Sequence, residues 1–239
     1  MHSNNTENKN TQIEINKEEQ NDMDFLKAQN NITIIDIPEQ VKEADKAEEA
    51  RIAERERINK HIIFYQFSKK RVYTTAIMAY LMSLAFKLVY TIIDNIIFDD
   101  KIENNSNQES IEGNLKKFGF VLALEIIDIC IYAPLVEEFI FRSFIFKLIN
   151  YGGKKVQKKV KVIGIIIRIL AFLISSFIFA FAHFGYSFEV LANEIRTFPV
   201  YFIMGLLLAY AYNRDGYILA SVLMHALNNA VAVLLIFIL

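Results

Sequence analysis

Apolar residues are concentrated after the first seventy positions of this 239-residue chain, where long hydrophobic stretches alternate with polar connections. A helix needs roughly 20 apolar residues to cross about 30 Å of hydrocarbon. Lys87 and Asp94 interrupt the first stretch, and the fourth is short for a span unless it extends upstream through residues 187–198. We predict an all-α, polytopic membrane protein with about five hydrophobic helices: Val72 to Phe98, Phe118 to Ile149, Val162 to Phe184, Pro199 to Tyr212 and Tyr217 to Leu239.

The polar N-terminal region divides into a tail and a charged segment. Met1 to Asn31 lacks the apolar core of a cleavable signal peptide and has the composition of a disordered tail. From Pro38 to about Tyr65 the pattern predicts a charged helix whose apolar residues are too sparse for a coiled-coil seam. We interpret it as a solvated stalk that leads into the membrane, with a partner-binding helix as the alternative.

Four regions follow from this pattern. Residues 1–37 form the polar tail and residues 38–71 the charged cytoplasmic helix. The first membrane helix and its loop occupy 72–117, and the core of the membrane protein occupies 118–239.

Basic residues predict the orientation of the spans. Lys69 to Arg71 precede the first span, and five lysines between Lys154 and Lys161 connect the second to the third. Cytoplasmic loops carry an excess of such residues. With five spans, the N-terminus is expected in the cytoplasm and the C-terminus outside.

Composition agrees with a membrane protein and excludes two classes of site. Hydrophobic residues make up 54% of the chain, aromatic residues 13%, and the mean hydropathy is +0.26. The net charge is −1 and neither half forms a basic surface, so nucleic-acid binding is not expected. The single cysteine, Cys130, excludes an intramolecular disulfide framework and a cysteine metal cluster; we interpret it as a small apolar filler.

The chemistry of the chain centres on charged residues inside the second stretch. A carboxylate at membrane depth costs roughly 2.5 to 3.5 kcal/mol, so such residues normally face a bundle interior or a wet cavity and mark function. Glu138 and Arg142 are four positions apart and share a helix face, where they can form an ordinary ion pair. Glu137 points about 100° away and has no obvious local partner.

Further polar residues at membrane depth lie on separate stretches. Taken singly, His183 is typical of a core histidine, and His225 with Asn229 is typical of residues that join membrane helices. Because three helices each carry costly groups, we interpret Glu137, the two histidines and Asn229 as one converging site. The others are Glu125, Asp128, Arg168 and Asn228, of which Glu125 and Asp128 have no assigned role.

This set of groups suits attack of an activated water on a carbonyl. A carboxylate in a low-dielectric cavity can take and return a proton, and an imidazole can share a water with it. A second imidazole and an amide, four residues apart on one helix face, can donate hydrogen bonds to an oxyanion. No serine or cysteine nucleophile is required.

Three motifs in order resemble a known family. They are Glu137-Glu138-x-x-x-Arg142, Phe179-x-x-x-His183 and His225-x-x-x-Asn229. This arrangement resembles the CPBP (ABI) intramembrane proteases, which include the type II CAAX prenyl endopeptidases, and the resemblance covers residues 118–239. Gly205-Leu206 and Asp215-Gly216 also look like the family's segment between its second and third motifs.

The resemblance implies a role for each motif residue. Glu137 and His183 would activate the attacking water, and His225 and Asn229 would form the oxyanion site. Glu138 and Arg142 would support the fold of the site, with Phe179 packed beside it. The implied protein is an endopeptidase in a bacterial cell membrane that acts on a peptide or membrane-protein substrate.

The candidate residues are compatible both with a zinc site and with a metal-free site. Glu137, His183 and His225 would make a zinc ligand set with an open fourth position. The chain has no His-Glu-x-x-His motif, and a glutamate-type mechanism uses the same residues without zinc. We expect no metal, with zinc as the alternative.

Two other classes of function are rivals. A non-catalytic bacteriocin self-immunity or scaffold membrane protein could keep the same fold, and loss of a catalytic position would favour it. A transporter or proton channel could use Glu125, Asp128, Glu137 and the histidines as a relay, and inverted repeats would favour it. The expected partners are the lipid bilayer, the substrate and, for the N-terminal helix, a cytoplasmic protein.

Overall fold

The computed structural model describes residues 39–59, 62–98 and 106–238, and the chain forms two compact units that divide after Arg57. The expected tail lies outside the described residues. In the first unit, α2 (Glu39–Asn59) forms a helix whose described side chains are all exposed. The charged helix therefore ends earlier than its pattern indicates, since Ile63–Phe67 forms a separate short helix, α3.

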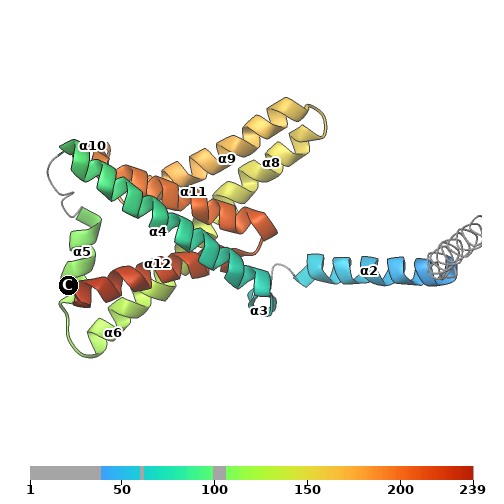
Figure 1. Ribbon diagram of the computed structural model, residues 1–239, viewed down its shortest axis with the longest axis horizontal. Helices are drawn as coiled ribbons and strands as arrows, with labels where there is room; N and C mark the ends of the chain where they lie inside the picture. Colours follow the sequence, from blue (N-terminus) through green and yellow to red (C-terminus); the bar gives the residue numbers. More distant parts are fainter. Residues whose placement is uncertain (1–38, 60–61, 99–105, 239) are drawn as a thin grey trace, which may run out of the picture. The chain divides into compact units, whose positions relative to one another are not determined.

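The second unit is built from helices (Figure 1). Among its described residues, four helices are long and apolar enough to cross a membrane: α4 (Lys70–Phe98), α9 (Lys161–Ala182), η3 with α11 (Ile195–Asp215) and α12 (Ile218–Ile238). The upstream extension of the fourth predicted stretch thus amounts to the short η3 (Ile195–Thr197) before α11 (Phe198–Asp215). The prediction of an all-α, polytopic membrane protein is confirmed. Two further short helices are α5 (Ser106–Leu115) and α10 (Phe188–Asn193).

The second predicted stretch is helical but changes its winding several times. It consists of consecutive segments without a break: α6 (Phe120–Ile127), η1 (Asp128–Tyr132), α7 (Ala133–Glu138), η2 (Phe139–Phe146) and α8 (Lys147–Gln157). The two η segments are π-helical, a winding that occurs mostly as short bulges and often at functional sites. Because these bulges divide the run, no single segment of it has the length of a span.

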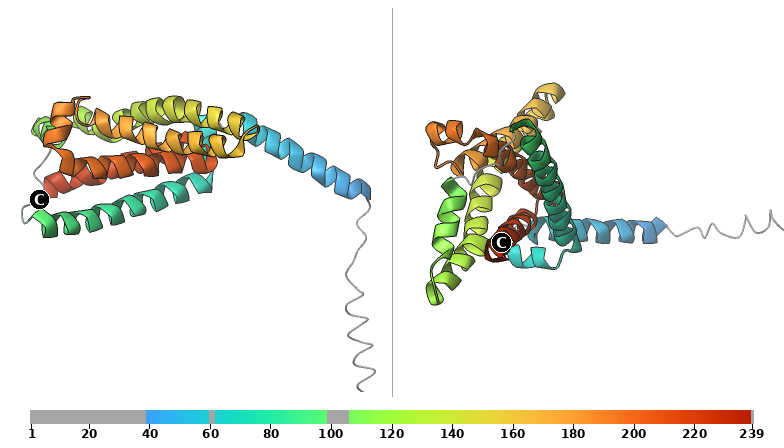
Figure 2. Two further views of the ribbon diagram at one scale, coloured as in Figure 1. Left: turned by 90° about the horizontal axis from the view of Figure 1, so that it is seen from above. Right: turned by 60° about the vertical axis from the view of Figure 1, so that its left-hand side comes forward.

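The spans pack through small residues on their inner faces. Helix α4 contacts α11 and α12, while α9 contacts α8 and α11; α4 and α12 run lengthwise in the left view of Figure 2. At Gly205 of α11, a Cβ would approach the backbone of Ser176 on α9 to 3.0 Å. Small residues allow such close approach between membrane helices. The outward side chains of α4, such as Leu88 and Ile92, are exposed apolar groups suited to contact with lipid.

Ion pairs fix the direction of α4 against α11. Asp94 near the end of α4 lies 2.5 Å from Arg196, which precedes α11. Arg71 near the start of α4 lies 3.0 Å from Asp215, which ends α11. The two helices are therefore antiparallel and tied at both ends.

A side chain of α3 caps the beginning of α12. Gln66 is almost fully buried, and its side-chain carbonyl accepts the backbone N–H of Leu219 at 2.8 Å. The first N–H groups of a helix have no partner within the helix, so a capping acceptor is needed when they are buried. This bond links the polar segment before the first span to the helix that carries His225.

Candidate active site

The motif residues meet at one polar cavity of about 490 Å³. Glu137 on α7, His183 at the end of α9, and His225 and Asn229 on α12 all line it. Helices α4, α5 and α11 complete its walls. The four side chains expected to carry catalysis thus come from three separate stretches of sequence to a single cavity.

Beneath this cavity lies a buried charged cluster. Glu138 and Arg142 are fully buried, and the Arg142 Nε donates to Glu138 Oε2 at 2.9 Å. The other carboxylate oxygen of Glu138 lies 3.2 Å from His225 Nδ1. Arg142 also donates to the hydroxyl of Ser175 at 3.4 Å, and its guanidinium lies 4.9 Å from the ring centre of Phe179. The opposite charges of Glu138 and Arg142 compensate each other, which makes their burial tolerable, while Arg142 Nη2 has no hydrogen-bond partner among the described residues.

The contact with Glu138 constrains the protonation of His225. An ionised carboxylate only accepts hydrogen bonds, so the His225 Nδ1 carries the proton in this contact. The other ring nitrogen, Nε2, lies 4.0 Å from Glu137 Oε2. Nε2 can donate to an oxyanion only when the ring is an imidazolium, a form that the Glu138 carboxylate stabilises.

Glu137 is the carboxylate of the cavity that has an unused oxygen. Its side chain is 33% exposed, yet its Oε2 is buried and has no hydrogen-bond partner among the described residues. Leaving a buried polar atom unpaired costs free energy, and such atoms call for an explanation such as a catalytic role. The 4.0 Å separation from His225 is too long for a direct hydrogen bond.

His183 is held by its own helix in a defined tautomer. Its Nδ1 lies 2.9 Å from the backbone carbonyl of Phe179, which can only accept, so Nδ1 carries the proton. The neutral ring therefore presents the lone pair of Nε2. Stacking on Tyr201, with ring centres 4.3 Å apart, and contact with Phe179 at 4.8 Å fix the plane of the ring.

Asn229 ends a chain of three side-chain hydrogen bonds. Its Nδ2 donates to the backbone carbonyl of Ile129 at 2.9 Å, and its Oδ1 accepts from Asn228 at 3.2 Å. Asn228 in turn accepts from the Lys87 ammonium at 2.5 Å. Sequence reasoning noted Lys87 only as an interruption of the first span. A lysine at membrane depth was the signal that could have marked it.

Other polar residues named from the sequence have different places. Asp128 lines the cavity, whereas Glu125 pairs with Lys117 at 2.5 Å. Arg168 bonds Asn150 and Gln157, so it joins α9 to α8. Tyr201 and Ser175, which contact His183 and Arg142, were missed because nothing in the sequence distinguishes them from other residues of apolar helices.

Glu137, His183 and His225, the residues of the alternative zinc site, do not form a ligand set in the structure. Within the described ranges, no group of three or more His, Cys, Asp or Glu side chains lies close enough together to hold a metal ion. The Nδ1 atoms of His183 and His225 are engaged by Phe179 and Glu138. Both contacts leave Nε2 of each ring available, and metal-bound histidines commonly donate their other ring N–H in the same way.

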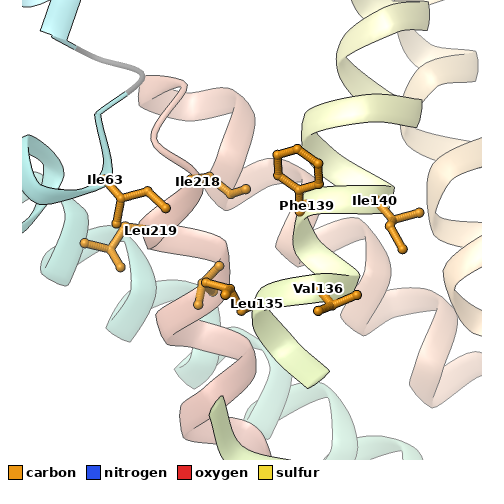
Figure 3. Close-up of a pocket in the computed structure, with 8 residues that line it drawn as sticks. Ile63, Leu135, Val136, Phe139, Ile140, Ile218 and Leu219 are labelled. Atoms are coloured by element: carbon orange, nitrogen blue, oxygen red, sulfur yellow. The ribbon is translucent and has the colours of Figure 1, made fainter. Parts of the chain in front are cut away.

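A second cavity lies nearer the start of α12 and is entirely apolar. Its volume is about 240 Å³, and Figure 3 shows the side chains from α3, α12 and the α7–η2 run around it. It contains no group able to transfer a proton, so the polar cavity is the candidate active site. The lining residues are Ile63, Leu135, Val136, Phe139, Ile140, Ile218, Leu219 and Val222.

Comparison with known proteins shows which proteins this membrane core resembles. Residues 119–231 match the Rce1-like family, described as type II CAAX prenyl endopeptidase Rce1-like. The chain is 27% identical to the membrane-embedded CAAX protease MroQ of Staphylococcus aureus over 70% of its own length and 59% of that relative. It is 27% and 29% identical to the UPF0177 proteins YaiF and YajF of Lactococcus lactis, over 52% and 48% of the chain.

The aligned stretches cover 42% to 59% of these relatives, so the chain spans about half of their length. No solved structure matches it. The matched residues include the polar cavity's α7, the end of α9 and most of α12. The membrane helices and these matches show a CAAX-protease-like integral membrane protein whose residues 119–231 match the Rce1-like family.

Proposed function

We propose that this protein is an intramembrane endopeptidase that hydrolyses peptide bonds with a water activated by Glu137 and His183. The observation that carries the proposal is the unpartnered Glu137 Oε2, buried in a cavity that also holds His183, His225 and Asn229. Of the four buried side-chain atoms without a partner among the described residues, Glu137 Oε2 is the one whose side chain lines this cavity. A group that exchanges protons with a water needs such a free oxygen.

Glu137 and His183 together activate the water that acts as the nucleophile. The carboxylate takes a proton from the water as its oxygen attacks the peptide carbonyl, and the Nε2 lone pair of His183 accepts the water's second hydrogen bond. Collapse of the tetrahedral intermediate returns the proton to the leaving nitrogen. The products are a carboxylate and an amine, and no covalent enzyme intermediate forms.

His225 and Asn229 stabilise the charge that develops on the carbonyl oxygen. The imidazolium form of His225 donates through Nε2, while Glu138 holds its Nδ1 and Arg142 holds Glu138. Asn229 donates through the Nδ2 hydrogen that Ile129 does not use. Donors fixed in this way act mainly in the transition state, where the oxyanion exists.

The proposed reaction uses no metal. The support is the spacing of the described side chains, among which no three His, Cys, Asp or Glu groups lie close enough together to hold a metal ion. If zinc were used, Glu137, His183 and His225 would be its ligands and the metal would lower the barrier to deprotonation of the water. A strong chelator is expected to leave cleavage unchanged, and loss of activity restored by zinc would favour the metal alternative.

The proposed substrate is a peptide or a membrane-protein segment that enters the polar cavity. The protein is proposed to lie in a bacterial cell membrane, as relatives from two bacteria suggest, with its N-terminus in the cytoplasm. Basic residues before α4 and between α8 and α9 support that orientation. The charged N-terminal helix is proposed to be a solvated stalk, with binding of a cytoplasmic partner as the alternative.

The test is cleavage of a quenched peptide library by purified protein in detergent. The wild type is compared with Glu137→Ala and His183→Ala, each with and without chelator, and thermal unfolding checks that the variants fold. Cleavage by the wild type with loss in both folded variants supports the proposal. Equal behaviour of all three proteins, in vitro and in cells, would favour the non-catalytic self-immunity or scaffold protein.

A further inference from the structure

A directed chain of hydrogen bonds links the first membrane helix to the proposed oxyanion site. Lys87 on α4 donates to Asn228 Oδ1, Asn228 Nδ2 donates to Asn229 Oδ1, and Asn229 Nδ2 donates to the carbonyl of Ile129. Each amide thus gives its oxygen to one neighbour and its nitrogen to the next.

The two ends of the chain determine the orientation of both amides. A lysine ammonium has three donors and no acceptor, so Asn228 must turn its oxygen toward Lys87. Asn228 then offers its NH₂ group to Asn229, which must turn its own oxygen toward Asn228. A backbone carbonyl at the other end only accepts, which agrees with the same orientation.

The helix has left the carbonyl of Ile129 available for Asn229. In an α-helix its donor would be the N–H of Ala133, but that group bonds the carbonyl of Asp128 in the π-helical turn. In a π-helix the donor would be residue 134, which is proline and has no N–H. The proline and the bulge together present an acceptor to α12.

The result of this arrangement is one free donor on Asn229. One Nδ2 hydrogen is bound by Ile129, and the other remains for the cavity that Asn229 lines. A flipped amide could present its carbonyl oxygen to the cavity, where it would repel an oxyanion. It could also present that oxygen to the carbonyl of Ile129, and the two acceptors would repel each other. The orientation of Asn229 therefore decides whether it can stabilise the intermediate.

We propose that Lys87 is a positioning residue of the active site, which acts through Asn228 to hold the Asn229 amide with its N–H toward the reacting carbonyl oxygen. This inference rests on the proposed function. It adds α4, which lies outside the family-matched residues 119–231, to the machinery of the site.

The alternative use of Lys87 is to bind a carboxylate of the substrate directly. It lines the cavity, and within the described residues no carboxylate lies within ion-pair distance of it. The two uses differ kinetically. A positioning residue changes kcat because the oxyanion exists only in the transition state, whereas a substrate anchor changes mainly KM.

The experiment measures kcat and KM for Lys87→Met, Lys87→Arg, Asn228→Asp, Asn229→Ala and the double variant Lys87→Met with Asn229→Ala. Lys158→Met, at an exposed position outside the spans, is the matched control and is expected to behave as wild type. Asn229→Ala is expected to lose about 100- to 1,000-fold in kcat, as oxyanion donors do. Lys87→Met is expected to lose between about 10-fold and 100-fold, with little change in KM.

Asn228→Asp is the sharpest single substitution. Aspartate keeps the contact with Lys87 but cannot donate to Asn229, so the chain breaks at its second bond and kcat is expected to fall. If Lys87 served only to anchor substrate or to stabilise the fold, this variant would keep its kcat. Lys87→Arg retains a donor and is expected to recover part of the loss.

The double variant decides whether Lys87 acts through Asn229. If it does, Lys87→Met causes no further loss of kcat once Asn229 is alanine. Independent, multiplied losses, or an effect of Lys87→Met confined to KM, would overturn the inference while leaving the protease proposal intact. Absence of cleavage by the wild type would overturn the proposed function and this inference with it.

Discussion

Two cavities of the membrane core, the polar one and the apolar one, share helices in their walls but differ in kind. Both lie between α12 and the run from η1 to η2. The apolar one, of about 240 Å³, is lined by aliphatic and aromatic side chains, whereas the polar one, of about 490 Å³, is lined by charged, imidazole and amide groups. Position along α12 separates them, since Ile218, Leu219 and Val222 precede His225 and Asn229.

The difference shows what each kind of surface requires in a bilayer. The apolar wall needs no partner, because hydrocarbon chains solvate it as well as another helix does. In the polar cavity nearly every costly group is held by another, from Arg142 through Glu138 to His225, and from Lys87 to Asn229. Four buried side-chain atoms have no hydrogen-bond partner among the described residues, Arg142 Nη2 among them, but Glu137 Oε2 is the one whose side chain lines the polar cavity, and we assign the chemistry to it.

The largest effect is expected from Glu137→Gln, which tests that assignment. The amide has nearly the same shape but cannot take a proton from water, so cleavage should fall by more than about 1,000-fold. Thermal unfolding in detergent should show an unchanged or higher midpoint, because glutamine carries no charge that must be removed from water at this site. Retained cleavage would mean that the unpartnered oxygen has no catalytic role.

The next effect is expected from Arg142→Met, which breaks the buried cluster below the polar cavity. Loss of the guanidinium leaves the Glu138 charge buried and less compensated, so the free energy of unfolding should fall by about 3 to 5 kcal/mol. Arg214→Met, at an exposed position of α11, is the control and should change it little.

A second substitution separates charge from packing in this test. Glu138→Gln added to Arg142→Met removes the uncompensated charge and should recover part of the lost stability, measured by thermal unfolding of the two variants side by side. If the double variant is no more stable than Arg142→Met alone, packing rather than charge accounts for the loss.

The smallest effects are expected from matched valine truncations in the two cavities. Val222→Ala enlarges the apolar cavity and should cost about 1 kcal/mol in stability without a change in kcat or KM. Val200→Ala enlarges the polar cavity and should alter KM for the peptide. A tenfold or greater loss of kcat in Val222→Ala would show that the apolar cavity takes part in the reaction.

Hydropathy predicted the membrane helices because each span must bury about the same length of apolar chain, whatever its neighbours are. The motif residues could be named for a similar reason, since a charge such as Glu137 inside an apolar helix stands out in one dimension. The roles of these residues remain proposals. Their arrangement in one cavity is a feature of the structure.

The remaining features depend on packing that a single sequence does not display. The bond from Lys87 to Asn228 joins residues 141 positions apart and depends on the rotation of α4 against α12. Tyr201 stacks on His183 from a helix rich in aromatic residues. The bulges around Pro134 do not follow from the sequence, because a proline shows where an N–H is missing and not how the neighbouring turns widen.

The bond between Gln66 and Leu219 gives α12 a reference point for its depth in the membrane. His225 follows Leu219 by six residues, which places it about 9 Å further along the helix axis. A bilayer that becomes thinner or thicker can tilt the spans, but it cannot slide α12 past α3 without breaking a buried hydrogen bond. The distance from the membrane surface at which a substrate is cut is therefore expected to be set by the protein, at a glutamine four residues before the first span, rather than by the surrounding lipid.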